Sequence, residues 1–258
     1  MKDDGSVDVM EPKNITRFAI LDPALQSSAP KLRVAGQVVP LPVLDAGSGP
    51  RQSVIGKRDG GWAYLGELGT VKLVGKRPGL QGPIDDAFAT RFLCVRGTGQ
   101  AWNPAVQAWA DASLKRFAGE WDRYFRGELP IKNDSDVTAE DVRSSNLILF
   151  GDPGSNRWIA QVLPGLPLVW TKQELVFGGA NYSAADHAVL LIHPNPLASD
   201  RYVVLNSGHT FGEQELASLN YLLFPRLGDW AVLNVPSREL VHAGFFDEQW
   251  RVAGRPAR

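Results

Sequence analysis

Two short polar loops contain the side chains of this chain that are best suited to nucleophilic or acid–base chemistry. They are Gly151-Asp-Pro-Gly-Ser-Asn156 and Asn206-Ser-Gly-His-Thr210. A neutral histidine near pH 7 can act as a general base, so His209 could activate Ser155, or alternatively Ser207, while Asp152 orients its ring. The competing interpretation is structural: a tight Asp-Pro-Gly turn capped by Ser155, and a loop histidine that hydrogen-bonds to the backbone.

The same loops could hold an anion. Glycine lets backbone N–H groups approach a ligand, and a helix that starts after the first loop would add unpaired donors. The first loop matches neither a P-loop, nor the dinucleotide fingerprint, nor the Gly-x-Ser-x-Gly nucleophile elbow. Arg96 and Thr98, which end an earlier apolar run, are also suited to an anion. The candidate ligand-binding residues are therefore Arg96, Thr98, Gly151, Gly154, Asn156, His193, Asn195, Asn206 and Ser207.

Three further polar groups have weaker assignments. His193-Pro-Asn-Pro196 is a stiff loop, whose polar side chains are those of His193 and Asn195. A metal site would need His193, His209 and a carboxylate to converge, and no His pair has metal-ligand spacing, so we expect neither a metal nor a cofactor. Asp85 and Asp86 either form an acid–base pair or cap a strand or helix. The single cysteine, Cys94, lies in an apolar run and is expected to be a buried, inert thiol.

Four apolar runs must position these loops. Runs of this length read as strands that are covered on both faces, and helical patterns lie between several of them. In an open parallel sheet, ligands bind outside the carboxyl ends of the strands, so all four following loops should meet at one edge. The runs are Arg91–Val95, Asn146–Phe150, Ala188–Ile192 and Tyr202–Leu205.

We therefore predict an α/β fold for residues 81–258: a mostly parallel open sheet with flanking helices, a flavodoxin- or Rossmann-like three-layer arrangement. Residues 1–80 read as a small antiparallel β-rich subdomain, and the Pro- and Gly-rich stretch Arg77–Pro83 connects the two. Capping signals predict helices that follow Asn103, Thr138 and Thr210, the last running to Pro225. Another helix is expected at Arg157–Val162, and closing strands at Trp230–Leu233 and Gln249–Val252.

Composition narrows the function classes. The 258 residues carry a formal net charge of −1, so no basic surplus favours nucleic acid or an anionic membrane. The first 30 residues contain no apolar signal-peptide core, and no apolar span of 18 residues occurs. We expect no nucleic-acid partner and no membrane segment.

Three stretches resemble a known family. They are Arg77-Pro-Gly-Leu-Gln-Gly-Pro-Ile-Asp-Asp-Ala-Phe88, Asn146-Leu-Ile-Leu-Phe-Gly-Asp-Pro-Gly-Ser-Asn156 and His193-Pro-Asn-Pro-Leu-Ala-Ser-Asp-Arg-Tyr-Val-Val-Leu-Asn-Ser-Gly208. Over most of residues 10 to 235 the chain resembles the C-terminal region of secreted bacterial proteins that carry a preceding prolyl-oligopeptidase-like α/β-hydrolase domain. The resemblance implies a periplasmic or secreted hydrolase system, with that domain as a partner, and assigns no catalytic residue to this region.

Two functions follow as hypotheses. The first is a hydrolase that cleaves an ester, amide or glycosidic bond at the carboxyl edge of the sheet, in a small-molecule, polysaccharide or peptide substrate. The second is a non-catalytic accessory module that binds a polymer or a partner domain and supports a secreted hydrolase. The eight tryptophans suit either a core or a carbohydrate-contacting surface.

Overall fold

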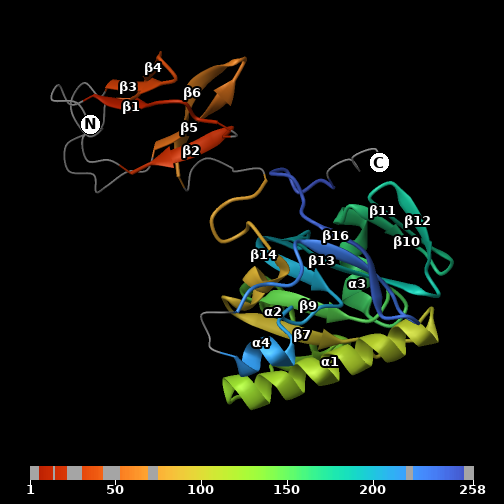
Figure 1. Ribbon diagram of the computed structural model, residues 1–258. Helices are drawn as coiled ribbons and strands as arrows, with labels where there is room; N and C mark the ends of the chain where they lie inside the picture. The colour runs from red at the N-terminus through yellow and green to blue at the C-terminus, as the bar shows by residue number, and fades with distance from the viewer. Residues whose placement is uncertain are drawn as a thin grey trace. The chain divides into compact units, whose positions relative to one another are not determined.

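The computed structural model describes residues 6–13, 15–21, 31–42, 53–68, 75–218 and 223–252. The chain divides into two compact units, Met1–Val74 and Gly75–Arg258 (Figure 1). The Arg77–Pro83 stretch belongs to the second unit, where the N–H of the preceding Lys76 donates to the carbonyl oxygen of Glu248 at 2.7 Å. Each unit has its own core.

The first unit contains two three-stranded sheets, ordered β1-β3-β4 and β2-β5-β6. Its core side chains alternate along the strands, and Leu32 and Val34 of β3 are buried against Trp62 of β6. The side chain of Gln37 exchanges two hydrogen bonds with the backbone of Trp62, at 3.0 and 2.7 Å. The strands are β1 (Val7–Val9), β2 (Arg17–Ile20), β3 (Lys31–Val34), β4 (Gln37–Pro40), β5 (Ser53–Arg58) and β6 (Gly61–Glu67).

The second unit is built on a seven-stranded mixed sheet in the order β16-β15-β13-β14-β9-β7-β8. Strands β14, β9, β7 and β8 are parallel to one another, whereas β13, β15 and β16 join the sheet through antiparallel pairs. The strands are β7 (Phe92–Arg96), β8 (Ile131–Asn133), β9 (Asn146–Phe150), β13 (His187–Asn195), β14 (Ala198–Leu205), β15 (Trp230–Asn234) and β16 (Glu239–Gly244).

Helices and a small antiparallel sheet surround this mixed sheet. The longest helix, α1, lies alongside β7 and β9 in Figure 1. The helices are α1 (Pro104–Phe125), α2 (Ala139–Ser144), α3 (Arg157–Val162) and α4 (Glu213–Ala217), with 3-10 helices η2 (Ile84–Phe88), η3 (Asp134–Asp136) and η4 (Leu163–Gly165). The small sheet contains β10 (Leu168–Trp170), β11 (Glu174–Phe177) and β12 (Ala180–Ser183).

The predicted flavodoxin- or Rossmann-like three-layer fold is wrong. Strands and bridges account for 39% of the described residues and helices for 23%, so the molecule is mostly β. The physical reason is that β13 turns directly into β14, and β15 into β16, as hairpins without a crossover helix. An apolar run looks the same in sequence whether its neighbour is parallel or antiparallel.

The helix and strand boundaries that were predicted from local sequence patterns are confirmed only in part. The capping box of Thr138 and Asp141 is present and starts α2, and α1 begins at Pro104, although the Asn103 side chain makes no capping bond. The helix expected after Thr210 begins instead after Gly212 and spans Glu213–Ala217, while residues 219–222 lie outside the described part. Gln249–Val252 forms only an isolated bridge between Val252 and Phe246 rather than a strand.

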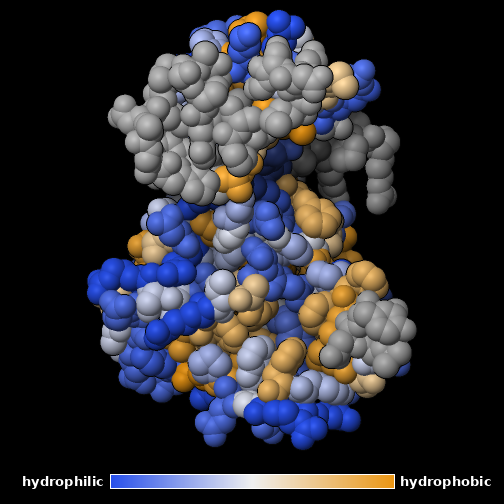
Figure 2. Space-filling model, turned by 90° about the vertical axis from the view of Figure 1, so that its left-hand side faces the viewer, coloured by the Kyte–Doolittle hydropathy of each residue, from blue (hydrophilic) through white to orange (hydrophobic). Residues whose placement is uncertain are grey.

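The surface adds two observations. Within the described ranges, no helix combines the length and the apolar character that crossing a bilayer would require. On the face shown in Figure 2, apolar side chains gather in several small areas among hydrophilic ones rather than in one continuous patch. Scattered apolar areas of this kind are ordinary and identify no docking surface.

Candidate functional site

The carboxyl ends of the parallel strands gather the polar loops at one edge, which we name the strand-end edge (residues 97–99, 151–156 and 206–210). The N–H of Asn206 donates to the carbonyl of Leu149 at 2.8 Å, and the N–H of Gly99 donates to the carbonyl of Ser155 at 2.7 Å. The loop of His193 is not part of this edge. Because β13 is antiparallel to β14, its turn lies at the opposite end of the sheet. The expectation that all four loops meet at one edge is therefore wrong for the loop that follows Ala188–Ile192.

The turn after β9 uses its polar groups internally. Asp152 accepts four backbone hydrogen bonds: from Gly154 and Ser155 at 2.9 Å each, and from Trp102 and Asn103 at 2.7 and 3.1 Å. The Ser155 hydroxyl accepts from the Asp152 N–H at 2.9 Å and donates to the Asp152 carbonyl at 3.2 Å. Both side chains are buried. This pattern stabilises the turn and leaves the hydroxyl without a base.

The remaining residues of this turn are also fixed by the fold. Gly151 has φ of 121°, and a Cβ there would lie 2.3 Å from the Ser155 hydroxyl, so the position requires glycine. Gly154 packs against Trp102 with no room for a side chain. Asn156 caps α3 through its contact with the Trp158 N–H and donates to the carbonyls of Val95 and Phe150. Asn156, rather than Ser155, is therefore the N-cap.

A carboxylate that the sequence did not single out binds the adjacent loop. Asp134, directly after β8, accepts from the Thr98 N–H at 3.1 Å, the Thr98 hydroxyl at 2.6 Å and the Arg157 N–H at 3.0 Å. Burial would raise the pKa of Asp134, but these hydrogen bonds outweigh it and hold the pKa below its ordinary value. Thr98 and the start of α3 are thus already occupied by an anion. Arg96 is exposed and has no ion-pair partner among the described residues.

The other predicted ligand-binding residues also have internal roles. The Asn206 side chain exchanges two hydrogen bonds with the Gly151 backbone, at 2.8 and 3.0 Å, and Ser207 donates to the Gly208 carbonyl. At the opposite end of the sheet, Asn195 accepts from the Leu197 N–H. His193 packs against the rings of Phe246 and Trp250, and burial lowers its pKa.

His209 faces helix α1 rather than Ser155. Its Nε2 lies 3.4 Å from Oε2 of Glu120, and the ring packs edge-on against Phe117. Burial, with a contribution from the charge of Arg116, lowers the pKa of His209 to about 4. No contact within the described ranges joins Ser155 or Asp152 to His209. The Ser155–His209–Asp152 triad is therefore not assembled.

The adjacent carboxylates of η2 are separated by their partners. Asp85 accepts from the N–H and the hydroxyl of Thr210, at 2.7 and 2.5 Å, and burial raises its pKa. Asp86 accepts from the Tyr202 hydroxyl at 2.5 Å, and burial raises the pKa of that hydroxyl. These bonds attach η2 to β14 and to the loop that follows it, and Asp85 occupies the Thr210 hydroxyl, which does not cap α4.

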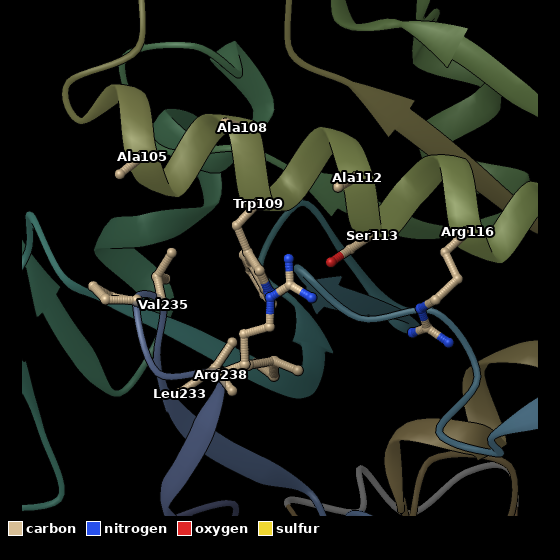
Figure 3. A pocket seen from close by; sticks show the side chains of 11 residues that line it. Ala105, Ala108, Trp109, Ala112, Ser113, Arg116, Leu233, Val235 and Arg238 are labelled. Atoms are coloured by element: carbon tan, nitrogen blue, oxygen red, sulfur yellow. The ribbon is translucent and has the colours of Figure 1, made fainter.

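A solvent-accessible groove lies in a different part of the second unit. This groove of about 660 Å³ lies between α1 and the turn that joins β15 to β16. Trp109 and Ser113 point from α1 toward this turn, which carries Val235 and Arg238, and Arg116 lines the groove further along the helix (Figure 3). Ala105, Ala108 and Ala112 keep the helix side shallow. We refer to this space as the groove.

The polar side chains of the groove are all hydrogen-bond donors or hydroxyls. Arg238 is exposed and has no hydrogen-bond or ion-pair partner in the described part of the chain, and the same holds for the Ser113 hydroxyl. Arg116 pairs with the buried Glu120 at 2.7 Å while its side chain stays 54% exposed. No carboxylate belongs to the described residues that line the groove. Its electrostatics therefore favour an anion.

Sequence reasoning missed this groove, although one signal was available. Glu120 occupies the apolar stripe of α1 together with Val106, Ala110, Leu114 and Phe117. A carboxylate in such a stripe needs a partner, and this requirement points to Arg116, one turn earlier. Arg238 gave no signal, because an arginine in a hairpin turn is ordinary. It adopts φ of 59°, the left-handed region.

Comparisons of the chain with protein-family models, with curated proteins and with solved structures found no match.

Proposed function

We propose that this chain is a non-catalytic binding module that supports a secreted or periplasmic hydrolase and takes its ligand in the groove. The extracytoplasmic setting, and a preceding α/β-hydrolase domain as partner, come from the resemblance of its sequence. The ligand site comes from the donors that line the groove.

The hydrogen bonding of the expected catalytic groups carries this proposal. A serine nucleophile needs its hydroxyl within hydrogen-bond reach of a base. The Ser155 hydroxyl is instead engaged with the backbone of Asp152, and His209 lies against Glu120. By contrast, the donors of Arg238 and Ser113 are available in an open groove. The arrangement of these side chains therefore supports ligand binding in the groove rather than hydrolysis at Ser155.

An activity and binding assay on the full chain tests the proposal. The purified protein is incubated with p-nitrophenyl esters, p-nitrophenyl glycosides and a peptide p-nitroanilide, and its co-sedimentation with insoluble polysaccharides is measured in parallel. We expect no turnover above buffer, together with retention on at least one polymer.

Three variants make the result decisive: Ser155→Ala, Ser207→Ala and His209→Ala. One result would contradict the binding module and support a hydrolase. The wild type would show turnover, and that turnover would be lost in His209→Ala and in one of the two serine variants. Circular dichroism of each variant establishes that a loss of turnover is not a loss of folding.

A further inference from the structure

We propose that the groove binds an acidic saccharide, a sugar ring that bears a carboxylate, such as one uronic-acid unit of a polysaccharide. This inference rests on the proposed function and specifies the ligand class. Its experiment separates the failure of the ligand class from the failure of the binding module.

Charge complementarity is the first argument. Among the described residues that line the groove there are two guanidinium groups and no acidic side chain: Arg116 is already paired with Glu120, and Arg238 supplies the unpaired positive charge. The guanidinium of Arg238 has no partner among the described residues, so a ligand would not need to displace an ion pair. Guanidinium binds carboxylates through two parallel N–H···O bonds, a geometry that also fixes orientation.

The aromatic and apolar lining is the second argument. Trp109 is half-buried and packs on the core, and its ring faces the turn that bears Arg238 (Figure 3). Leu233 and Val235 form apolar surface on the other side. A sugar ring has an apolar C–H face that suits an indole surface and hydroxyls that suit donors such as Ser113. A small inorganic anion would leave the apolar surface uncovered.

The topology around the groove disfavours a peptide. Extended peptides gain affinity by adding a strand to an exposed sheet edge. The strand at the groove, β15, is already paired on both sides, with β13 and with β16. The groove therefore offers side-chain donors rather than a backbone ladder, and such donors suit a saccharide.

The test compares an acid with its neutral ester. Binding of a short oligogalacturonate to the full chain is measured by isothermal titration calorimetry, beside the fully methyl-esterified oligosaccharide, which has the same rings without the charge. We expect the acid to bind at least tenfold more tightly. We also expect its affinity to weaken as salt is raised, because a charge contact in an open groove is screened.

A matched pair of variants locates the site. Arg238→Gln removes the free guanidinium of the groove, and Arg96→Gln removes another exposed arginine, at the end of β7 beside the strand-end edge. We expect Arg238→Gln to weaken binding at least tenfold and Arg96→Gln to leave it unchanged. Neither side chain is buried, so both proteins should fold, and their thermal unfolding is recorded as a check.

Several results would overturn the ligand class. These are no binding of the acid, equal binding of acid and ester, full competition by inorganic phosphate at equal concentration, or loss of binding in Arg96→Gln instead of Arg238→Gln. Retention on a neutral polysaccharide without turnover would then leave the binding module intact. Cleavage of the oligogalacturonate that disappears in His209→Ala would instead contradict the module itself.

Discussion

At the strand-end edge the carboxylate of Asp152 accepts hydrogen bonds from four backbone N–H groups, whereas in the groove the guanidinium of Arg238 has no partner among the described residues. The edge has the residue types that suggest nucleophilic and acid–base chemistry, yet hydrogen bonds within the fold occupy those side chains. The groove has an unremarkable sequence, yet its donors are available. Residue type alone does not distinguish a polar group that holds a turn from one that can hold a ligand.

The largest expected effect is at the centre of the edge. Asp152→Ala would leave four backbone N–H groups without their acceptor, and we expect a loss of roughly 3–5 kcal/mol in the free energy of unfolding. Denaturant unfolding monitored by circular dichroism measures the change. Asp152→Asn keeps one acceptor, the side-chain amide oxygen, and should show a smaller loss of unfolding free energy. A change below about 1 kcal/mol in Asp152→Ala would mean that the edge does not depend on this carboxylate.

The second effect concerns pH and the buried pair of His209 and Glu120. Burial holds the pKa of His209 at about 4, below its ordinary value of 6.5, so the unfolded chain binds more protons between these two pH values. The contribution of His209 to stability is therefore present above pH 6.5 and falls as the pH drops toward 4. We expect a loss of about 2–3 kcal/mol over this range.

Comparison with His209→Phe isolates this term, because phenylalanine suits the surrounding rings and does not titrate. The variant should show a flatter dependence of unfolding free energy on pH between 6.5 and 4 than the wild type. Parallel curves for the two proteins would refute the assignment of this dependence to His209.

A smaller effect is expected for Ser155→Ala. The substitution removes the acceptor of one buried N–H, and we expect a loss of about 1–2 kcal/mol in unfolding free energy. Ligand binding in the groove should be unchanged, because the hydroxyl has its partners within the turn. Calorimetric titration of the variant checks this second outcome. An unchanged stability with weakened binding would reverse the assignment of the two regions.

The smallest effect on stability is expected in the groove. Arg238→Ala removes an exposed side chain without a partner, and its unfolding free energy should stay within about 0.5 kcal/mol of the wild type. Thermal and denaturant unfolding measure it. A loss above about 2 kcal/mol would show that this arginine belongs to the fold, as the residues of the strand-end edge do.

The sequence predicted those features that depend on neighbours along the chain. The apolar runs became β7, β9, β13 and β14, and the Thr138 capping box starts α2, because burial on both faces and local capping leave local patterns. The direction of β13 could not be read, since the same run fits either side of a hairpin. Because β13 is antiparallel, His193 lies away from the strand-end edge, and the expected three-layer fold is not formed.

The candidate site shows the same division. Gly151 and Asn206, which the sequence suggested as ligand-binding residues, instead adopt the positive φ of sharp turns, a conformation that favours glycine and asparagine. Whether a polar side chain keeps a free donor depends on partners that are distant in sequence, as Asp134 is for Thr98. Among the described residues Arg238 has no such partner, and the residues next to it in the sequence do not indicate this.

The left-handed backbone at Arg238 has a consequence of its own. Glycine adopts this conformation freely, whereas a residue with a Cβ is disfavoured there by about 1 kcal/mol. Arg238→Gly is therefore expected to raise the free energy of unfolding and, at the same time, to weaken binding of the acidic saccharide. If one substitution raises stability and weakens binding, the arginine contributes to ligand contact and not to the stability of the fold.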